Sequence, residues 1–247
     1  MANWITATIV NKHFWTHRLV TLQFEADVSQ FKAGQFIRVG MDIQGERVGR
    51  PYSLVNAAHQ RPHEIYFNIV PGGPLSPRLA KLEQGDNLWV YDMAHGFLTL
   101  DEVPDVPDLW MLSTGTAVGP FLSMLNAEEL WRRFEHVVLA HAVRTADELS
   151  YQENINAALK HHPMRFRFVP FVSRETKPDT IHGRIPASIR DQQLEGFAGL
   201  SIDSSRSHVM LCGNSGMIDD AIKALADRGM RRHRRNEPGH ITTEKYH

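Results

Sequence analysis

The stretch STGTAVGP, residues 113–120, joins a run with the character of a strand to a run with the character of a helix. DLWMLST (108–114) is almost entirely apolar, and GPFLSMLNAEELWRRF (119–134) has apolar residues at helical spacing. A turn between a strand and a helix presents backbone N–H groups that can bind an anion. Glycine-containing turns are common in α/β proteins, so the stretch predicts the fold class and leaves an anion site and a plain turn equally open.

The alternation of strand and helix continues to the C-terminus. The strand-like runs are HVVLAHAV (136–143), RFRFVPFVSR (165–174) and SHVMLCG (207–213), and the helix-like runs are ELSYQENINAALKHH (148–162) and SGMIDDAIKALADRG (215–229). This order predicts βαβ units and a Rossmann-like parallel sheet. CGNSGM (212–217) repeats the strand-to-turn arrangement, and two such turns at the carboxyl ends of parallel strands are what a dinucleotide crevice requires.

The chain before residue 101 has a different texture. Its strand-like runs are short: WITATIV (4–10), RLVTLQFEA (18–26), QFIRVGM (35–41), YSLVNA (52–57), EIYFNIV (64–70) and NLWVYDM (87–93). Short strands separated by turn residues indicate an antiparallel barrel or sandwich. We therefore expect a β-barrel domain over 1–101, a linker over 102–108 with two prolines, and an α/β domain over 109–247.

Composition excludes several classes of protein. The 247 residues include 27 Lys and Arg against 28 Asp and Glu, which gives no basic excess of the kind that nucleic-acid binding needs. The single cysteine, Cys212, allows neither an internal disulfide nor an iron–sulfur cluster held by four thiolates. The histidines show no metal-ligand spacing, so we expect no metal. Without a signal sequence or a long apolar run, the chain is expected to be a cytoplasmic monomer that does not enter membranes.

Polar residues at the start of one barrel strand suggest a ligand. GRPYSLVNAA (49–58) places Arg50, Pro51, Tyr52 and Ser53 ahead of its apolar run. A charge, a residue without a backbone donor, an aromatic ring and a hydroxyl fit a ligand better than a core. The alternative is an edge strand with scattered polar residues.

Arginines follow another predicted strand end, in VSRET (172–176) and GRIP (183–186). The planar guanidinium suits the 2′-phosphate of NADP, whereas NAD binding usually uses an acid on the ribose. Most arginines in loops are simply solvated, so the two interpretations stand about even.

Six motifs in order resemble the ferredoxin–NADP reductase family, in particular its short bacterial type, which also reduces flavodoxin. They are RPYS (50–53), GGPLSPRL (72–79), STGTAVGPF (113–121), SRET (173–176), CGNSGM (212–217) and EKYH (244–247). The resemblance covers nearly the whole chain. It implies that the barrel binds FAD and that the α/β domain binds NADP(H).

The resemblance also implies a role for each motif residue on the FAD side. Arg50 would neutralise the pyrophosphate, Tyr52 would stack on the isoalloxazine, and Ser53 would approach N5. Pro51 is tolerated where the strand faces a cofactor. The remaining implied FAD contacts are Tyr66, Phe67, Asn68, Ile69, Pro74, Leu75, Ser76, Thr116, Tyr246 on the flavin ring and His247 on the adenine.

For the hydride step the resemblance implies Ser53, Cys212, Glu244 and Tyr246 around flavin and nicotinamide. The residues implied for NADP(H) are Thr116, Arg144, Ser173, Arg174, Arg184, Asn214, Ser215 and Gly216. The implied reaction passes hydride from NADPH to flavin and then single electrons to an acidic ferredoxin or flavodoxin. RRHRR (231–235) is either a basic docking surface for that partner or a solvated helix end.

Two other functions remain open on sequence grounds. One is a diaphorase-like NADPH-dependent flavin or quinone reductase that has the same fold and no protein partner. The other is a nucleotide-binding module without catalytic activity.

Overall fold

The computed structural model describes residues 2–246, which form two compact units. The first unit contains the residues up to Thr99 together with Gly119–Ala127, and the second contains Leu100–Val118 and the residues from Glu128 onward. The expected domain boundaries at 101 and 109 stay a prediction, because compactness alone does not decide where a domain begins. No helix among the described residues is long and apolar enough to cross a membrane.

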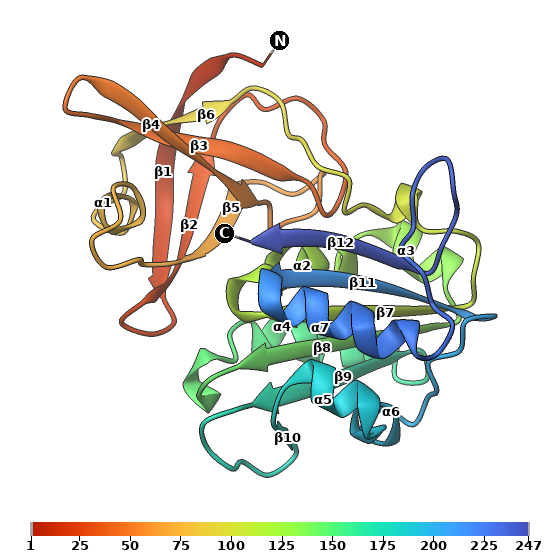
Figure 1. Ribbon diagram of the computed structural model, residues 1–247. Coiled ribbons are helices and arrows are strands. Elements are labelled where there is room, and N and C mark those ends of the chain that lie inside the picture. Colours follow the sequence, from red (N-terminus) through yellow and green to blue (C-terminus); the bar gives the residue numbers. More distant parts are fainter. Residues whose placement is uncertain (1, 247) are drawn as a thin grey trace. The chain divides into compact units, whose positions relative to one another are not determined.

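The first unit is built on a six-stranded antiparallel sheet (Figure 1). Its strands are β1 (Trp4–Phe14), β2 (Leu19–Glu25), β3 (Phe36–Ile43), β4 (Glu46–Ser53), β5 (His63–Asn68) and β6 (Asn87–Tyr91), in the order β4-β3-β6-β1-β2-β5. A bridge between Leu54 and Ile65 joins the chain just after β4 to β5, so the two ends of the sheet meet. Alternation in β1 buries Ala7 and Ile9 and leaves Thr8 exposed, which gives the barrel its core. Helices α1 (Ser76–Leu79) and α2 (Gly119–Leu125) complete this unit.

The second unit contains a six-stranded parallel sheet of order β10-β9-β8-β7-β11-β12. Its strands are β7 (Asp108–Thr114), β8 (His136–Val143), β9 (Phe166–Val172), β10 (Ile181–His182), β11 (Ser207–Asn214) and β12 (Ile241–Tyr246). β7 and β8 are buried along almost their whole length, as strands covered on both faces must be. The predicted fold class, an antiparallel barrel followed by a Rossmann-like parallel sheet, is confirmed.

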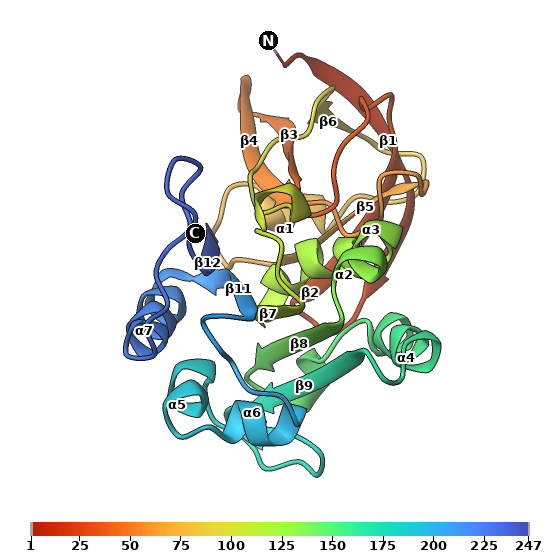
Figure 2. The same ribbon diagram turned by 90° about the vertical axis from the view of Figure 1, so that its right-hand side faces the viewer.

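Helices cover both faces of this sheet. The α-helices are α3 (Glu128–Arg133), α4 (Gln152–His161), α5 (Ile185–Arg190), α6 (Gln193–Ala198) and α7 (Ser215–Ala226), and the 3-10 turns are η1 (Leu100–Glu102), η2 (Gly115–Val118) and η3 (Ala146–Glu148). Figure 2 shows α5, α6 and α7 on one face and α4 on the other. From β7 the chain adds β8 to β10 on one side, then returns to add β11 and β12 on the other. The strand order therefore reverses at β7, and ligands of such sheets bind at the carboxyl ends of the strands beside this point.

Two predicted helices are shorter than the sequence suggested. The run 119–134 divides into α2 and α3, because the Asn126 amide donates to the Leu122 carbonyl where α2 ends. The run 148–162 becomes helical only from Gln152, since Tyr151 has a left-handed backbone with φ of 60°. The segment 102–108, predicted as a linker, contains a hydrogen bond from Arg133 to the carbonyl of Val103 at 2.7 Å, and its role as a linker stays a prediction.

Candidate functional site

Residues 50–53 form the end of β4, in the first unit. Strand alternation puts Arg50 and Tyr52 on one side of β4 and Pro51 and Ser53 on the other. Arg50 is exposed, and its guanidinium donates to the Gly49 carbonyl at 2.9 Å without a carboxylate partner among residues 2–246. Its positive charge is therefore uncompensated within that part of the chain.

Tyr52 is half-buried beside the aromatic residues of β5. Its ring meets that of Phe67 edge-on, with 5.7 Å between ring centroids. Burial raises the pKa of Tyr52 to about 12, so the hydroxyl stays neutral. Tyr66 is buried like Phe67, whereas Asn68 is exposed and Ile69 is half-buried. The structure therefore brings together Tyr52 and Phe67, two of the predicted FAD contacts, and leaves Asn68 exposed. Their contact with FAD stays a prediction.

The loop between β5 and α1 carries the second predicted FAD motif. Gly72 has a φ of +74° with open space around it, which favours glycine in this turn. The Ser76 hydroxyl accepts a hydrogen bond from the Val70 amide at 2.9 Å, and the Arg78 guanidinium donates to the Pro74 carbonyl at 2.6 Å. Arg78 is a residue that the sequence reasoning missed, although it belongs to the quoted motif.

The residues of the first unit fit an anionic cofactor such as FAD. The backbone N–H groups of Leu75 and Ser76 have no acceptor within residues 2–246, although both residues are buried. Unpaired backbone donors near a basic side chain suit a pyrophosphate, which offers oxygen acceptors and negative charge. No described hydrogen bond joins Arg50 to this loop, so their joint action on one phosphate group stays a prediction.

In the second unit, two turns meet at the carboxyl ends of β7 and β11. Gly213 has a φ of +154°, and a Cβ there would lie 2.2 Å from the Thr114 hydroxyl oxygen. That oxygen lies 3.3 Å from the backbone nitrogen of Asn214, whose side chain in turn caps α7 by accepting from the Met217 amide at 2.9 Å. Thr114 thus links the two motifs, a role that only the parallel pairing of β7 and β11 reveals.

Several of the residues predicted to bind NADP lie in or beside these two turns. Ser215 and Gly216 are the first residues of α7, where backbone N–H groups lack helical partners. Thr116 lies in η2, which begins at Gly115 with a φ of +56°. Tyr246 pairs in register with Asn214, so it lies beside the turn after β11. His247 lies outside the described residues.

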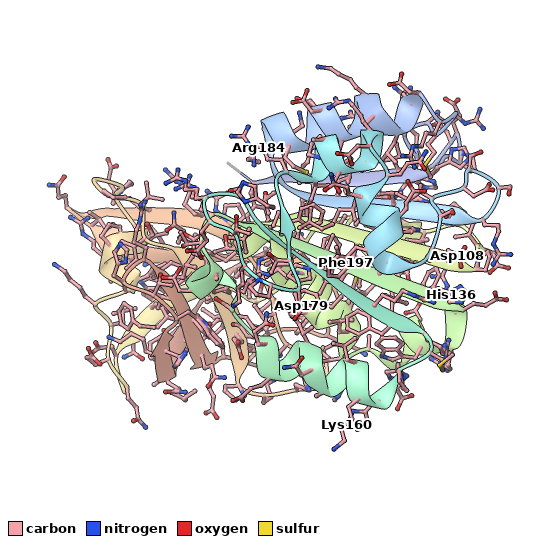
Figure 3. All side chains as sticks on the ribbon, turned by 90° about the horizontal axis from the view of Figure 1, so that it is seen from below. Asp108, His136, Lys160, Asp179, Arg184 and Phe197 are labelled. Atoms are coloured by element: carbon pink, nitrogen blue, oxygen red, sulfur yellow. The ribbon has the colours of Figure 1, made fainter. Side chains whose placement is uncertain are left out.

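The predicted arginines follow β8, β9 and β10. The backbone N–H of Arg174 donates to the carbonyl of Arg144 at 2.9 Å, and Ser173 donates to the Val143 carbonyl in the same ladder. Arg184 precedes α5 and is marked in Figure 3. All three arginine side chains are exposed, and none has a carboxylate partner within residues 2–246.

Glu175, the acid nearest to these arginines in sequence, does not neutralise them. Its carboxylate accepts a hydrogen bond from the backbone N–H of Ala146 at 2.5 Å. Glu148 lies at this edge too, and its carboxylate accepts a hydrogen bond from the backbone N–H of Arg144 at 2.9 Å. No carboxylate therefore pairs with the three guanidinium groups within residues 2–246, and their binding of an anion stays a prediction.

Cys212 and Glu244 are direct neighbours on β11 and β12. Burial, with the charge of Glu244, raises the pKa of the fully buried Cys212 thiol well above its usual value. Burial likewise raises the pKa of Glu244 to about 7. The pair therefore offers a neutral thiol and a carboxyl group that can hold a proton near neutral pH. Ser53 belongs to the first unit, and its predicted approach to this pair stays a prediction.

One group of possible metal ligands lies at the other end of the sheet (Figure 3). Ligand atoms of Asp108, Glu135 and His136 lie within 4.8 Å of one another. The Arg206 guanidinium pairs with Asp108 at 3.2 Å and with Glu135 at 3.4 Å. A guanidinium in contact with both carboxylates competes with a cation, so these residues form an ion-pair network.

Comparison with known proteins agrees with this geometry. Residues 6–91 match the oxidoreductase FAD-binding domain, and residues 111–223 match the oxidoreductase NAD-binding domain. The chain is 45% identical over 247 residues to the flavodoxin/ferredoxin–NADP reductases of Shigella flexneri and Escherichia coli, and the match covers 100% of each chain. A ferredoxin NADP+ reductase from Neisseria gonorrhoeae, solved with bound FAD and NADP, is 33% identical with a TM-score of 0.94, covering 99% of both chains. The resemblance seen in the motifs is confirmed, and this chain belongs to the flavodoxin/ferredoxin–NADP reductase family.

Proposed function

We propose that this protein is an FAD-dependent enzyme that takes hydride from NADPH and delivers single electrons to a ferredoxin or flavodoxin. The observation that carries the proposal is a group of unpaired guanidinium groups at the carboxyl edge of the parallel sheet. There the side chains of Arg144, Arg174 and Arg184 lack acid partners within residues 2–246, while the carboxylates of Glu148 and Glu175 are held by backbone amides. The FAD-binding domain match and the related structure with FAD and NADP support the same cofactors.

The barrel residues hold the flavin in this proposal. FAD, when bound, supplies the atom that accepts hydride and the ability to release electrons one at a time. Arg50 and the unpaired amides of Leu75 and Ser76 bind its phosphates, and Tyr52 supports the ring from the β4 side. Tyr66, Phe67, Asn68 and Ile69 line the ring and ribitol, with Pro74 fixing the loop.

In the hydride step, the protein residues position the two cofactors and hold a proton. Ser53 would offer its hydroxyl to the bound flavin, and the neutral thiol of Cys212 would offer an uncharged surface to the nicotinamide. Glu244, with its pKa raised to about 7, holds a proton beside Cys212. The role of covering the flavin ring is assigned in this proposal to Tyr246, and His247 lies outside the described residues.

The α/β domain binds NADP(H) through its strand-end turns. Arg174 and Arg184 bind the 2′-phosphate together with the Ser173 hydroxyl, and Arg144 is a third member of this set. Thr116, Asn214, Ser215 and Gly216 contact the rest of the dinucleotide from the turns after β7 and β11.

The partner binds at an arginine hairpin, which we define as residues 231–240. These residues are not a helix end, because α7 stops at Ala226 and the backbones of Arg231 and His240 are hydrogen-bonded at 2.8 Å. Arg235 is neutralised by Glu102 at 2.6 Å, but Arg234 has no side-chain partner within residues 2–246. An exposed arginine without an acid partner suits the acidic surface of an electron carrier.

The absorption spectrum of the purified protein tests the enzyme directly. We expect flavin bands that bleach when NADPH is added without oxygen and that bleach much less with NADH. A protein without flavin bands would be the non-catalytic nucleotide-binding module. A flavoprotein that bleaches equally with both coenzymes would contradict the NADP assignment.

A further inference from the structure

His141 is a fully buried polar residue in the middle of the parallel sheet. It belongs to β8, where it pairs with Ser113 of β7. Its Nε2 atom lies 3.0 Å from the carbonyl oxygen of Gly115, the first residue of the turn after β7. Its Nδ1 atom is buried without a hydrogen-bond partner within residues 2–246. The buried imidazole is therefore removed from water and makes one described hydrogen bond, which is to the turn after β7.

The direction of this hydrogen bond follows from its acceptor. A carbonyl oxygen can only accept, so Nε2 carries the hydrogen and Nδ1 is bare in the neutral ring. Burial lowers the pKa of His141 to about 4, and the ring is neutral near physiological pH. His141 thus donates a hydrogen bond to the Gly115 carbonyl.

This bond fixes the orientation of the peptide group between Gly115 and Thr116. The C=O and N–H of a trans peptide point in opposite directions. Because the carbonyl is held toward the His141 ring, the Thr116 N–H points away from that ring. Thr116 is the second residue of η2, where a backbone N–H has no partner within the turn, and no acceptor outside η2 is described for it among residues 2–246. We infer that this N–H is available to a ligand.

Steric contacts do not supply the same constraint. Gly115 has a φ of +56°, and no atom lies within 4 Å of the place where its Cβ would be. A glycine without side-chain contacts leaves the orientation of the following peptide group to its hydrogen bonds and to the backbone of η2, which begins at Gly115. Thr114 is held by Asn214, but that contact acts on the residue before the glycine. His141 is therefore the described side-chain contact that acts on this peptide group.

We propose that His141 is a positioning residue for NADP(H), which aims the Thr116 N–H at the dinucleotide from beneath the turn. The proposal rests on the NADP(H) binding proposed above. Without the imidazole donor, the Gly115 carbonyl loses the side-chain hydrogen bond that holds it toward β8, the Thr116 N–H is aimed less firmly, and binding weakens.

Titration of the holoenzyme with NADP+, followed by the flavin difference spectrum, tests this role. His141→Met removes the donor and keeps a similar volume, whereas His141→Gln keeps an N–H at similar reach. We expect the Kd for NADP+ to rise about tenfold or more in His141→Met and to recover in part in His141→Gln. The Kd for 2′-phospho-AMP should change little, because that probe lacks the nicotinamide half and depends mainly on the arginines.

His208→Met is the matched control. His208 is also fully buried, lies on the other strand beside β7, and contacts Thr242 at 2.7 Å rather than the turn. We expect this variant to lose stability and to keep the wild-type Kd for NADP+. If His141→Met does not fold, the Kd values for NADP+ of His141→Gln and His141→Asn are compared instead. The Gln variant should bind NADP+ more tightly, because only the Gln side chain is long enough to place an N–H at the position of Nε2.

Three results would overturn the positioning role: an unchanged Kd for NADP+ in His141→Met, an equal loss of NADP+ and 2′-phospho-AMP binding, or the same loss in His208→Met. In the fallback pair, equal affinities of the Gln and Asn variants would do so too. Failure of the wild-type enzyme to bind 2′-phospho-AMP would instead overturn the NADP assignment, and the positioning proposal with it.

Discussion

The carboxyl group of Glu244 lies in a partly buried position on β12, and this position affects its ionisation. Burial raises its pKa to about 7, whereas the unfolded chain ionises this group near its usual value. Between those two values the folded state holds a proton that the unfolded state has released. The contribution of Glu244 to the free energy of unfolding is therefore most favourable at low pH. It falls as the pH rises toward 7 and is constant above that pH.

Replacement by glutamine should remove this dependence. We predict that Glu244→Gln matches the wild type in free energy of unfolding near pH 5 and exceeds it at pH 8, by at most about 3 kcal/mol. Urea unfolding of both holoenzymes at the two pH values measures the difference. A gap that is equal at pH 5 and pH 8 would show that Glu244 does not carry the shifted ionisation.

Arg174 is the residue on which we expect coenzyme choice to depend most. A charge-assisted hydrogen bond to the 2′-phosphate contributes roughly 1.5–3 kcal/mol. We predict that Arg174→Ala raises the KM for NADPH about tenfold or more and leaves that for NADH nearly unchanged. Arg190→Ala is a suitable control, because Arg190 is an exposed arginine of α5 whose side chain contacts only the Asp220 carbonyl among residues 2–246. Equal losses for both coenzymes would make Arg174 structural.

Among the helices, strands and turns, the sequence predicts those features that residues close together in the chain determine. The strand and helix alternation and the turns at 113–120 and 212–217 follow from residues close together in the chain. The division of α2 from α3 depends on a side-chain hydrogen bond of Asn126, which no periodicity displays. The contacts of Thr114 with Asn214 and of His141 with Gly115 arise from strand pairing, so the structure was needed to find them.

The arginine hairpin is an element whose role depends on charge. We predict that the double change Arg231→Glu and Arg234→Glu slows electron transfer to ferredoxin or flavodoxin several-fold at low salt and leaves ferricyanide reduction unchanged. The effect should shrink as salt rises, because exposed charges are screened. Rates measured across a salt series, with each acceptor in turn, give the comparison.

A matched pair of changes separates position from net charge. Arg132→Glu with Lys160→Glu makes the same change in net charge on α3 and α4, outside the hairpin. This control should keep the wild-type rates. Equal slowing in both double variants would mean that overall charge, rather than the hairpin, governs encounter with the carrier.

At the scale of the whole molecule, a net charge of −1 conceals local positive regions. The arginines after β8 and β9 and the hairpin at 231–240 each concentrate positive charge within the second unit. A count of charges over the whole chain therefore cannot locate a site for a phosphate or an acidic protein. The positions of Arg144 and Arg174, 30 residues apart in sequence and adjacent in the sheet, come from parallel register.

The proposed reaction uses NADPH to reduce a protein electron carrier. It can be tested by the initial rate of flavodoxin or ferredoxin reduction by the purified holoenzyme, with free FMN as the alternative acceptor at the same low concentration. We expect NADPH-dependent reduction of the carrier that is faster than reduction of FMN and that falls steeply when NADH replaces NADPH. Faster reduction of free FMN, as a diaphorase-like enzyme would show, or equal rates with both coenzymes, would contradict it.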